Sequence, residues 1–202
     1  KKSLIALAFG TLALGMAEFA MMGILPYVAS DFGVSISEAG HLISAYALGV
    51  CFGAPVLILA RKKSLKHILM ALVSLIIIGN LCASLAPNYW VMMIGRFISG
   101  LPHGAYFGVA SIVASKLADK GKSSEAVSIM IAGMTVANLF GVPLGTSLSH
   151  LISWRTTFMF VGLWGVIVFY YIWRWVPVGE GLQDSGFKGQ FRFLRTPARG
   201  LY

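Results

Sequence analysis

Two ionisable residues, Glu18 and Arg96, lie inside stretches of sequence that are otherwise uncharged. Glu18 separates the uncharged runs 3–17 and 19–30, and Arg96 separates the runs 67–95 and 97–115. Charged side chains are costly in hydrocarbon, and those found there usually face a bundle interior and mark a substrate or proton path. If these runs cross a membrane, Glu18 is a candidate proton carrier, because movement between a dry environment and one beside a cation would load or release its proton.

The depths of the two residues can be compared from the rise of an α-helix. Counting inward from Leu4 at about 1.5 Å per residue places Glu18 roughly 21 Å from the cytoplasmic boundary. Counting from Tyr89 places Arg96 roughly 10 Å from the opposite boundary, which is about 20 Å from the first in a core about 30 Å thick. We therefore expect the acid and the guanidinium to come together in the outer half of the membrane. The alternative is a static salt bridge that fixes the packing of two helices.

Other polar side chains fall near the same level, each from a different apolar stretch. They are Tyr46, Asn80 and Asn138. Polar groups from five stretches at one level predict a central hydrated cavity, with hydrogen bonds between helices as the alternative, above all for the two asparagines.

His103 follows Pro102 and is predicted to lie nearer the cytoplasmic half of the membrane. A proline removes one helical hydrogen bond, so we expect the His103 ring to bond the backbone carbonyl that Pro102 leaves free. The alternative is a group that titrates near neutral pH.

The elements that must position these residues are long apolar helices. The chain has 202 residues, of which 57% are hydrophobic and 11% are charged, whereas a soluble domain carries about a quarter charged residues. This composition excludes an ordinary soluble enzyme, a disordered tail and a disulfide scaffold, and cations placed in short clusters between apolar runs do not form a nucleic-acid-binding face. The sequence predicts an all-α membrane protein with six transmembrane helices. The predicted spans are about 3–28, 39–60, 67–86, 89–115, 125–149 and 156–175.

Positive charge is distributed unevenly over the predicted loops and termini. Fourteen of the sixteen Lys and Arg residues fall on one side of the predicted membrane, Arg155 falls on the other, and Arg96 lies within a span. The positive-inside rule therefore predicts that both termini are cytoplasmic. Residues 1–178 are expected to form the bundle. Residues 179–202 are expected to form a cytoplasmic linker with an interfacial basic helix.

Glycines recur four residues apart on three of the spans. They are Gly49 and Gly53, then Gly100, Gly104 and Gly108, and then Gly141 and Gly145. This spacing is typical of closely packed membrane helices, although it is common in them. Pro143 is expected to bend the fifth span, which is then either a packing surface or a pivot.

Taken together, these motifs resemble those of the major facilitator superfamily. Residues 95–104, an Arg followed by spaced glycines, resemble its fourth-helix motif, and residues 133–146, from Gly133 through Pro143, resemble the fifth-helix motif of its antiporters. Residues 17–26 are similar to the first helix of the drug:proton antiporter branch. Within that branch the chain resembles bacterial sugar and arabinose efflux permeases. One departure is the loop of Arg61 and Lys62, which keeps only the basic character of the family's motif.

The resemblance implies the N-terminal six-helix half of a proton-coupled efflux transporter of the bacterial inner membrane, built from two inverted three-helix repeats. It implies that Glu18 carries the coupling proton and that Arg96 modulates its affinity. It also implies a half-cavity for sugars or small amphipathic compounds, lined by Phe19, Tyr46, Asn80, Asn138 and His103.

The expected partners are the lipid bilayer, a small-molecule substrate, and either a second six-helix half or a second copy of the chain. The coupling ion is a proton, and we expect no cofactor, metal, nucleic acid or enzymatic reaction. Two alternatives stay open, a half-size transporter that acts as a homodimer and a fragment or truncated product without transport activity.

Overall fold

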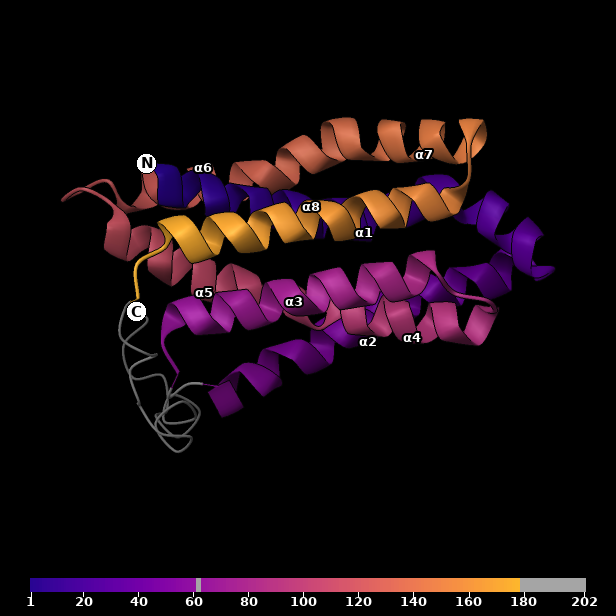
Figure 1. Cartoon of the computed structure of the whole chain (residues 1–202), viewed down its shortest axis with the longest axis horizontal. Coiled ribbons are helices and arrows are strands. Elements are labelled where there is room, and N and C mark those ends of the chain that lie inside the picture. Colours follow the sequence, from indigo (N-terminus) through magenta and orange to yellow (C-terminus); the bar gives the residue numbers. More distant parts are fainter. Residues whose placement is uncertain (61–62, 179–202) are drawn as a thin grey trace, which may run out of the picture.

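The fold was analysed in a computed structural model, which describes residues 1–60 and 63–178. The predictions for Arg61, Lys62 and the segment 179–202 lie outside the described residues. The described chain is a bundle of long helices joined by short turns (Figure 1). Its elements are α1 (Lys2–Phe32), α2 (Ile36–Ala60), α3 (Leu65–Ser84), α4 (Tyr89–Gly100), α5 (Pro102–Leu117), α6 (Ser123–Val136), the π-helical turn η1 (Ala137–Gly141), α7 (Val142–Leu151) and α8 (Trp154–Trp175).

Several of these elements join into longer rods. The segment Tyr89–Leu117 unites α4 and α5, and the segment Ser123–Leu151 unites α6, η1 and α7. With α1, α3 and α8, these make five helices in the described residues that are long and apolar enough to cross a membrane. The prediction of an all-helical membrane protein is therefore confirmed, while α2 as a sixth span stays a prediction.

Local sequence explains where the helices begin and end. α1 ends at Gly33, whose φ of 64° lies in the left-handed region that glycine adopts without strain. α2 begins with a reciprocal cap, in which the Glu38 carboxylate accepts from the Ser35 N–H at 2.8 Å and Ser35 Oγ accepts from the Glu38 N–H at 3.1 Å. Asn88 caps α4 in a similar way, because its side chain accepts from the Val91 N–H at 2.9 Å.

Two prolines mark irregular turns within the rods. Between α4 and α5 the Leu101 N–H is shared by the carbonyls of Phe97 and Ile98, at 3.3 Å each. Pro102 has no N–H, so it cannot donate the regular helical hydrogen bond to the carbonyl of Ile98, four residues earlier. Before Pro143 the helix widens into η1, as is common where the regular hydrogen-bond ladder is interrupted. The regular helix of the fifth span is thus interrupted by a π-turn just before Pro143, while a bend or pivot at this point stays a prediction.

The helix contacts follow a two-fold pattern. When each of the first three rods is exchanged with the corresponding one of the last three, most contacting pairs become other contacting pairs. α1 packs against α6 and α7 as α2 packs against α4 and α5, and α1 packs against α8 as α3 packs against α4. The pair α3 and α8 maps onto itself. Two related three-helix units would give this pattern of contacts.

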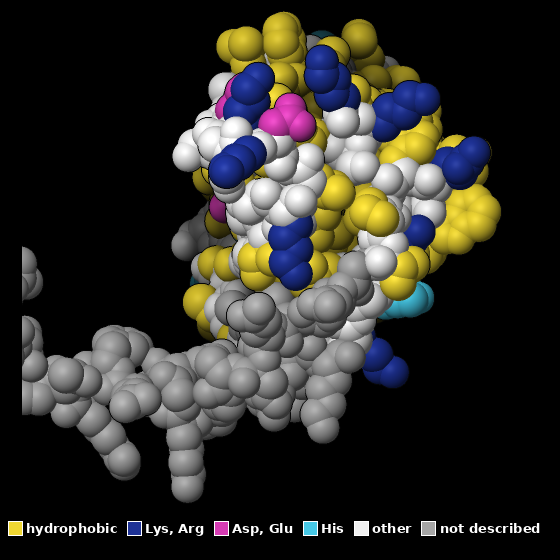
Figure 2. All heavy atoms as spheres, turned by 90° about the vertical axis from the view of Figure 1, so that its left-hand side faces the viewer, with side chains coloured by type: hydrophobic (Ala, Val, Ile, Leu, Met, Phe, Trp, Pro, Cys, Tyr) yellow, Lys and Arg dark blue, Asp and Glu magenta, His cyan; other side chains and the backbone are white. Residues whose placement is uncertain are grey.

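The two ends of the bundle differ in charge. Figure 1 shows the N-terminus and the C-terminal end of α8 at the same end of the bundle. Figure 2 looks onto this end, which we call the basic end, and shows Lys and Arg side chains spread over it. Its described basic residues are Lys1, Lys2, Lys63, Lys66, Lys116, Lys120, Lys122 and Arg174.

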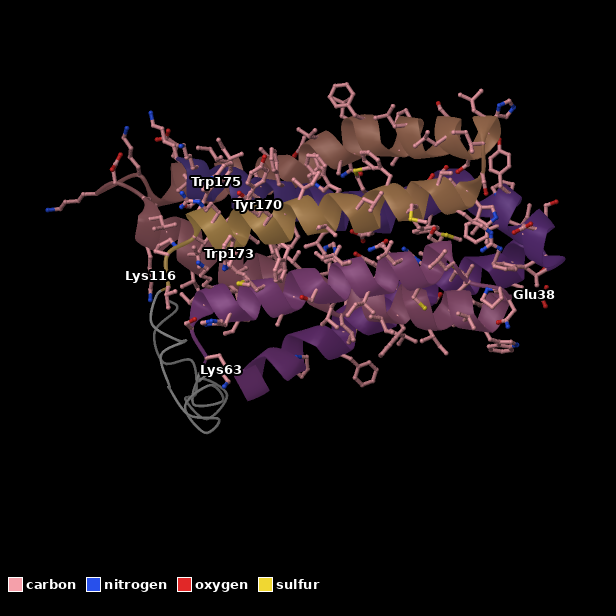
Figure 3. The ribbon with its side chains drawn as sticks, viewed as in Figure 1. Glu38, Lys63, Lys116, Tyr170, Trp173 and Trp175 are labelled. Carbon is pink, nitrogen blue, oxygen red and sulfur yellow. The ribbon has the colours of Figure 1, made fainter. Side chains whose placement is uncertain are left out.

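Aromatic side chains lie beside these cations, as at a membrane–water interface. In Figure 3 Tyr170, Trp173 and Trp175 of α8 lie toward the basic end, the end that also carries Lys63 and Lys116, while Glu38 lies at the opposite end. Trp and Tyr are enriched at such interfaces, so the pattern is consistent with a bundle that spans a bilayer. Which end faces the cytoplasm stays a prediction.

Candidate functional site

Arg96 is buried in the middle of the bundle and contacts three neighbouring helices. Its side chain has no exposed surface. Nη1 donates to the Ala17 carbonyl of α1 at 2.6 Å, and Nε donates to the Leu42 carbonyl of α2 at 3.4 Å. The guanidinium lies 4.5 Å from the ring centre of Tyr46 and 5.5 Å from that of Phe158 in α8. Nη2 has no hydrogen-bond partner among the described residues, so carbonyl dipoles and aromatic faces hold this charge.

Glu18 lies on α1 next to the carbonyl that Arg96 binds, but its ionic partner is another residue. Its Oε2 atom lies 3.7 Å from Nε2 of His103 on α5, and its side chain is 33% exposed. The expected approach of Glu18 to Arg96 is thus indirect, through Ala17 and through His103 and Tyr46. One side of the Glu18 carboxyl group therefore faces the bundle while the other remains accessible.

Tyr46 of α2 connects His103 to Arg96. Its hydroxyl lies 2.9 Å from Nδ1 of His103 and 3.5 Å from the Leu14 carbonyl. The His103 ring meets the Tyr46 ring edge-on, with 5.9 Å between ring centres. Glu18, His103, Tyr46 and Arg96, from four different helices, therefore form one connected group, which we call the buried network.

The expected bond from His103 to a freed carbonyl is wrong. The freed carbonyl belongs to Ile98, and it accepts from the Leu101 N–H within the same turn. The imidazole is therefore free to face Tyr46 and Glu18. The spacing in the sequence indicates this placement of His103, because Arg96 and His103 are seven residues apart, about two helical turns, and so share one face of their rod.

The other predicted cavity residues are outside the buried network. Asn80 is buried in α3, where Nδ2 donates to its own helix at the Ile76 carbonyl at 2.8 Å and Oδ1 has no partner among the described residues. Asn138 is exposed within η1, and Phe19 is half-buried on α1. The role of these three residues in a substrate cavity therefore stays a prediction.

Close helix contacts occur at most of the predicted glycines. A Cβ atom on Gly49 or Gly53 of α2 would overlap the backbone carbonyl oxygens of Phe97 and Leu101 at the junction of α4 and α5. Gly100 meets α2 in return at the Tyr46 carbonyl. Backbones in contact here bring Tyr46 over Arg96.

The glycines of the fifth rod differ in what they meet. Gly133 lies against the Ala8 carbonyl of α1, Gly141 would place a Cβ 2.9 Å from Cγ of Met16, and Gly145 would place one 3.1 Å from Cγ2 of Thr157. On the fourth rod Gly104 is half-buried. Gly108 has open space where its Cβ would lie, so the prediction of a close helix contact is wrong for Gly108.

A second polar cluster, which the sequence did not indicate, ties three turns together at the end opposite the basic end. Arg155 contacts the Asp31 carboxylate at 3.2 Å and donates to the carbonyls of Ala86 at 2.6 Å and Ser84 at 3.2 Å. The Trp154 indole also donates to Asp31, at 3.1 Å. These bonds join the ends of α1 and α3 to the start of α8.

Comparison with known proteins places this geometry in a family. The model of the Major Facilitator Superfamily matches residues 7–200. The putative transporter AraJ of Escherichia coli K12 is 49% identical over 202 residues, which is 100% of this chain and 51% of AraJ. A probable sugar efflux transporter of Helicobacter pylori P12 is 28% identical over 176 residues, 87% of this chain and 44% of that protein.

Solved structures agree on the fold. A POT family transporter in complex with a thioalcohol-conjugated peptide superposes with a TM-score of 0.76 at 15% identity, over 95% of this chain and 43% of that one. The chain spans about half the length of the curated relatives that it matches. With a matching family model over nearly all of its length and a transporter's helical fold, the chain is a multi-pass membrane protein that belongs to the major facilitator superfamily.

Proposed function

We propose that this chain acts as the N-terminal half of a proton-coupled efflux transporter of the bacterial inner membrane. Its family supports transport, and the similarity to a probable sugar efflux transporter supports sugars or small amphipathic compounds as substrates. The completing partner would be a second six-helix half, as the length of the relatives favours. The basic end of the bundle would then face the cytoplasm, and the opposite end, which carries the Asp31 and Arg155 cluster, would face outward.

The observation that carries the proposal is the half-exposed carboxyl group of Glu18 beside a buried cation. A proton-coupling group must reach water and must also feel a charge that favours releasing the proton. Glu18 is 33% exposed, whereas Arg96, which donates to the carbonyl of the preceding residue Ala17, is fully buried. Arg96 would set the proton affinity of Glu18 through its positive charge, which is held next to Glu18 by the hydrogen bond to the Ala17 carbonyl.

The half-cavity would lie on the accessible side of Glu18. On α1 the next residue on that face is Met22, which is 57% exposed, and η1, which packs against α1, exposes Asn138. A polar amide and a carboxyl group exposed at mid-helix are costly against lipid, so a second half with a water-filled path between is the favoured covering.

The test is the charge-removing variant Glu18→Gln in the protein as its gene encodes it. We expect proton-driven efflux to be lost while expression and thermal stability are kept, because the amide preserves shape but carries no exchangeable coupling proton. The measurement is pH-driven transport in proteoliposomes with labelled arabinose and with ethidium as the amphipathic probe.

The matched control is Glu38→Gln, since Glu38 is an exposed carboxylate at the start of α2 and outside the buried network. Efflux in Glu18→Gln that keeps the parent's dependence on the pH gradient would reject proton coupling at this residue.

A further inference from the structure

We propose that His103 is the proton partner of Glu18, so that the coupling proton is shared between the carboxylate and the imidazole. This inference rests on the proposed function and names a second residue of the same site. It assigns His103 a positioning and proton-holding role rather than contact with substrate.

The geometry places the imidazole between the accessible carboxyl group and the closed interior. Nε2 of His103 lies 3.7 Å from Glu18 Oε2, and Nδ1 lies 2.9 Å from the Tyr46 hydroxyl. The side chain of His103 is 13% exposed, against 33% for Glu18. A proton that enters from the accessible side therefore meets Glu18 first and His103 next.

Proton transfer between the two groups balances without a co-reactant. A protonated Glu18 faces the Nε2 lone pair of the neutral ring that carries its proton on Nδ1. When the two groups approach by the roughly 0.5–1 Å that separates 3.7 Å from a hydrogen-bond distance, the O–H bond breaks and an Nε2–H bond forms. The product is a carboxylate that faces an imidazolium, with the proton kept inside the pair.

The Tyr46 hydroxyl can satisfy the ring in each state. When Nδ1 carries a proton, the ring donates to the hydroxyl oxygen of Tyr46, whose own proton turns toward the Leu14 carbonyl at 3.5 Å. When the proton is on Nε2 alone, the hydroxyl instead donates to Nδ1. A rotating hydroxyl thus lets His103 gain or lose a proton without leaving a buried polar atom unpaired.

The charged and titratable groups around His103 are few and come from known helices. α1 contributes Glu18, α2 contributes Tyr46, and α4 contributes Arg96 behind the Tyr46 ring. On α5 itself Tyr106 lies one turn away, where its hydroxyl donates to the Leu7 carbonyl at 3.2 Å. The remaining neighbours are α3 and α6. Their charged groups, Lys66 and His67 of α3 and Glu125 of α6, lie near the basic end, and Cys82 of α3 lies near the opposite end. Glu18 is therefore the one carboxylate in the described residues within ion-pair reach of this ring.

The test reads both groups without a substrate, in the protein as its gene encodes it and in lipid nanodiscs. Infrared spectroscopy follows the protonated carboxyl band of Glu18, and nitrogen-15 NMR follows the His103 imidazole. We expect His103→Gln to move the carboxyl midpoint, and Glu18→Gln to move the imidazole midpoint, by the same amount of about one pH unit, since coupling between two sites is reciprocal. His150→Gln, at an exposed histidine of α7, is expected to move neither midpoint.

A carboxyl midpoint unchanged in His103→Gln would overturn the inference. If that variant does not fold, Tyr46→Phe serves instead, because it removes the hydroxyl but keeps the ring over Arg96. It should move the imidazole midpoint, and an unmoved midpoint would again overturn the proposal. Transport separates the two hypotheses: proton-driven efflux that survives Glu18→Gln rejects the proposed function, whereas loss in Glu18→Gln with unmoved midpoints rejects only the role of His103.

Discussion

Arg96 shows how a membrane protein can hold a cation without a counter-charge in contact. Its two placed hydrogen bonds go to the carbonyls of Ala17 and Leu42, and Nη2 has no partner among the described residues. A buried ion with incomplete hydrogen bonding pays a desolvation cost that its bonds do not fully return. We infer that Arg96 is kept for its effect on Glu18 rather than for stability.

This view predicts that Arg96→Met keeps the fold and loses proton coupling. Apolar replacements of buried ionic groups are often neutral or stabilising by about 1–4 kcal/mol, so the midpoint of thermal unfolding in detergent should stay the same or rise. Proton-driven efflux in proteoliposomes should fall to the level of Glu18→Gln. Arg155→Met is the matched control, because Arg155 bonds to Asp31 and two carbonyls; its unfolding midpoint should fall. A large loss of stability in Arg96→Met alone would show that the residue is a structural bridge.

At the same scale, the sequence identified most of the buried network but assigned one of its bonds wrongly. Glu18 and Arg96 stand out because they interrupt uncharged runs, and Tyr46 follows from depth alone. His103 was expected to bond the Ile98 carbonyl, but the Leu101 N–H donates a hydrogen bond to that carbonyl instead. Such competition within a single turn is decided by helix packing, which spacing along one chain does not reveal.

At the scale of the elements, α2 and the α4–α5 rod approach until their backbones touch. Gly49, Gly53 and Gly100 make this possible, since the space for a Cβ is filled by carbonyl groups of the facing helix. The same approach sets Tyr46 against both Arg96 and His103. The geometry of the network is thus a consequence of glycines outside it.

Gly49→Ala should therefore destabilise the bundle, whereas Gly108→Ala should not. The added methyl of Gly49→Ala meets the Phe97 carbonyl, which is fixed in a helix, so we expect a loss of about 1–3 kcal/mol from overpacking. Gly108 faces open space within a helix, where alanine is favoured by up to about 1 kcal/mol. Detergent unfolding followed by circular dichroism compares the two, and equal midpoints would contradict the close contact of α2 with α4.

Element boundaries were largely predictable, because caps and prolines are local signals. The predicted span 89–115 begins at the residue where α4 begins, directly after Asn88, and irregular turns occur at Pro102 and before Pro143. The Asp31 and Arg155 cluster was not predictable, since Asp31 and Arg155 are 124 residues apart and meet only when α1 and α8 pack together.

At the scale of the whole molecule, the contact pattern and the charge pattern point the same way. Exchange of the first three rods with the last three preserves most of the helix pairs, although α7 packs against α8 without a matching contact of α2 with α3 in the described residues, and two repeats would give such a pattern. Cations gather on the end that carries the N-terminus and the end of α8 (Figures 1 and 2). The positive-inside rule predicts that the end richer in Lys and Arg faces the cytoplasm, and this orientation can be measured.

Cysteine labelling in whole cells is the measurement that decides this topology. In a background with Cys51 and Cys82 replaced by alanine, Ser37→Cys should react with a membrane-impermeant maleimide in intact cells, and Lys120→Cys should react only after permeabilisation. Both positions are exposed, one at the start of α2 and the other in the turn between α5 and α6, so a difference in labelling reports the side of the membrane. Each variant is its own control after lysis, when both should label fully. Lys120→Cys labelled in intact cells with Ser37→Cys protected would invert the bundle, and the basic end would then have to face outward against the charge rule.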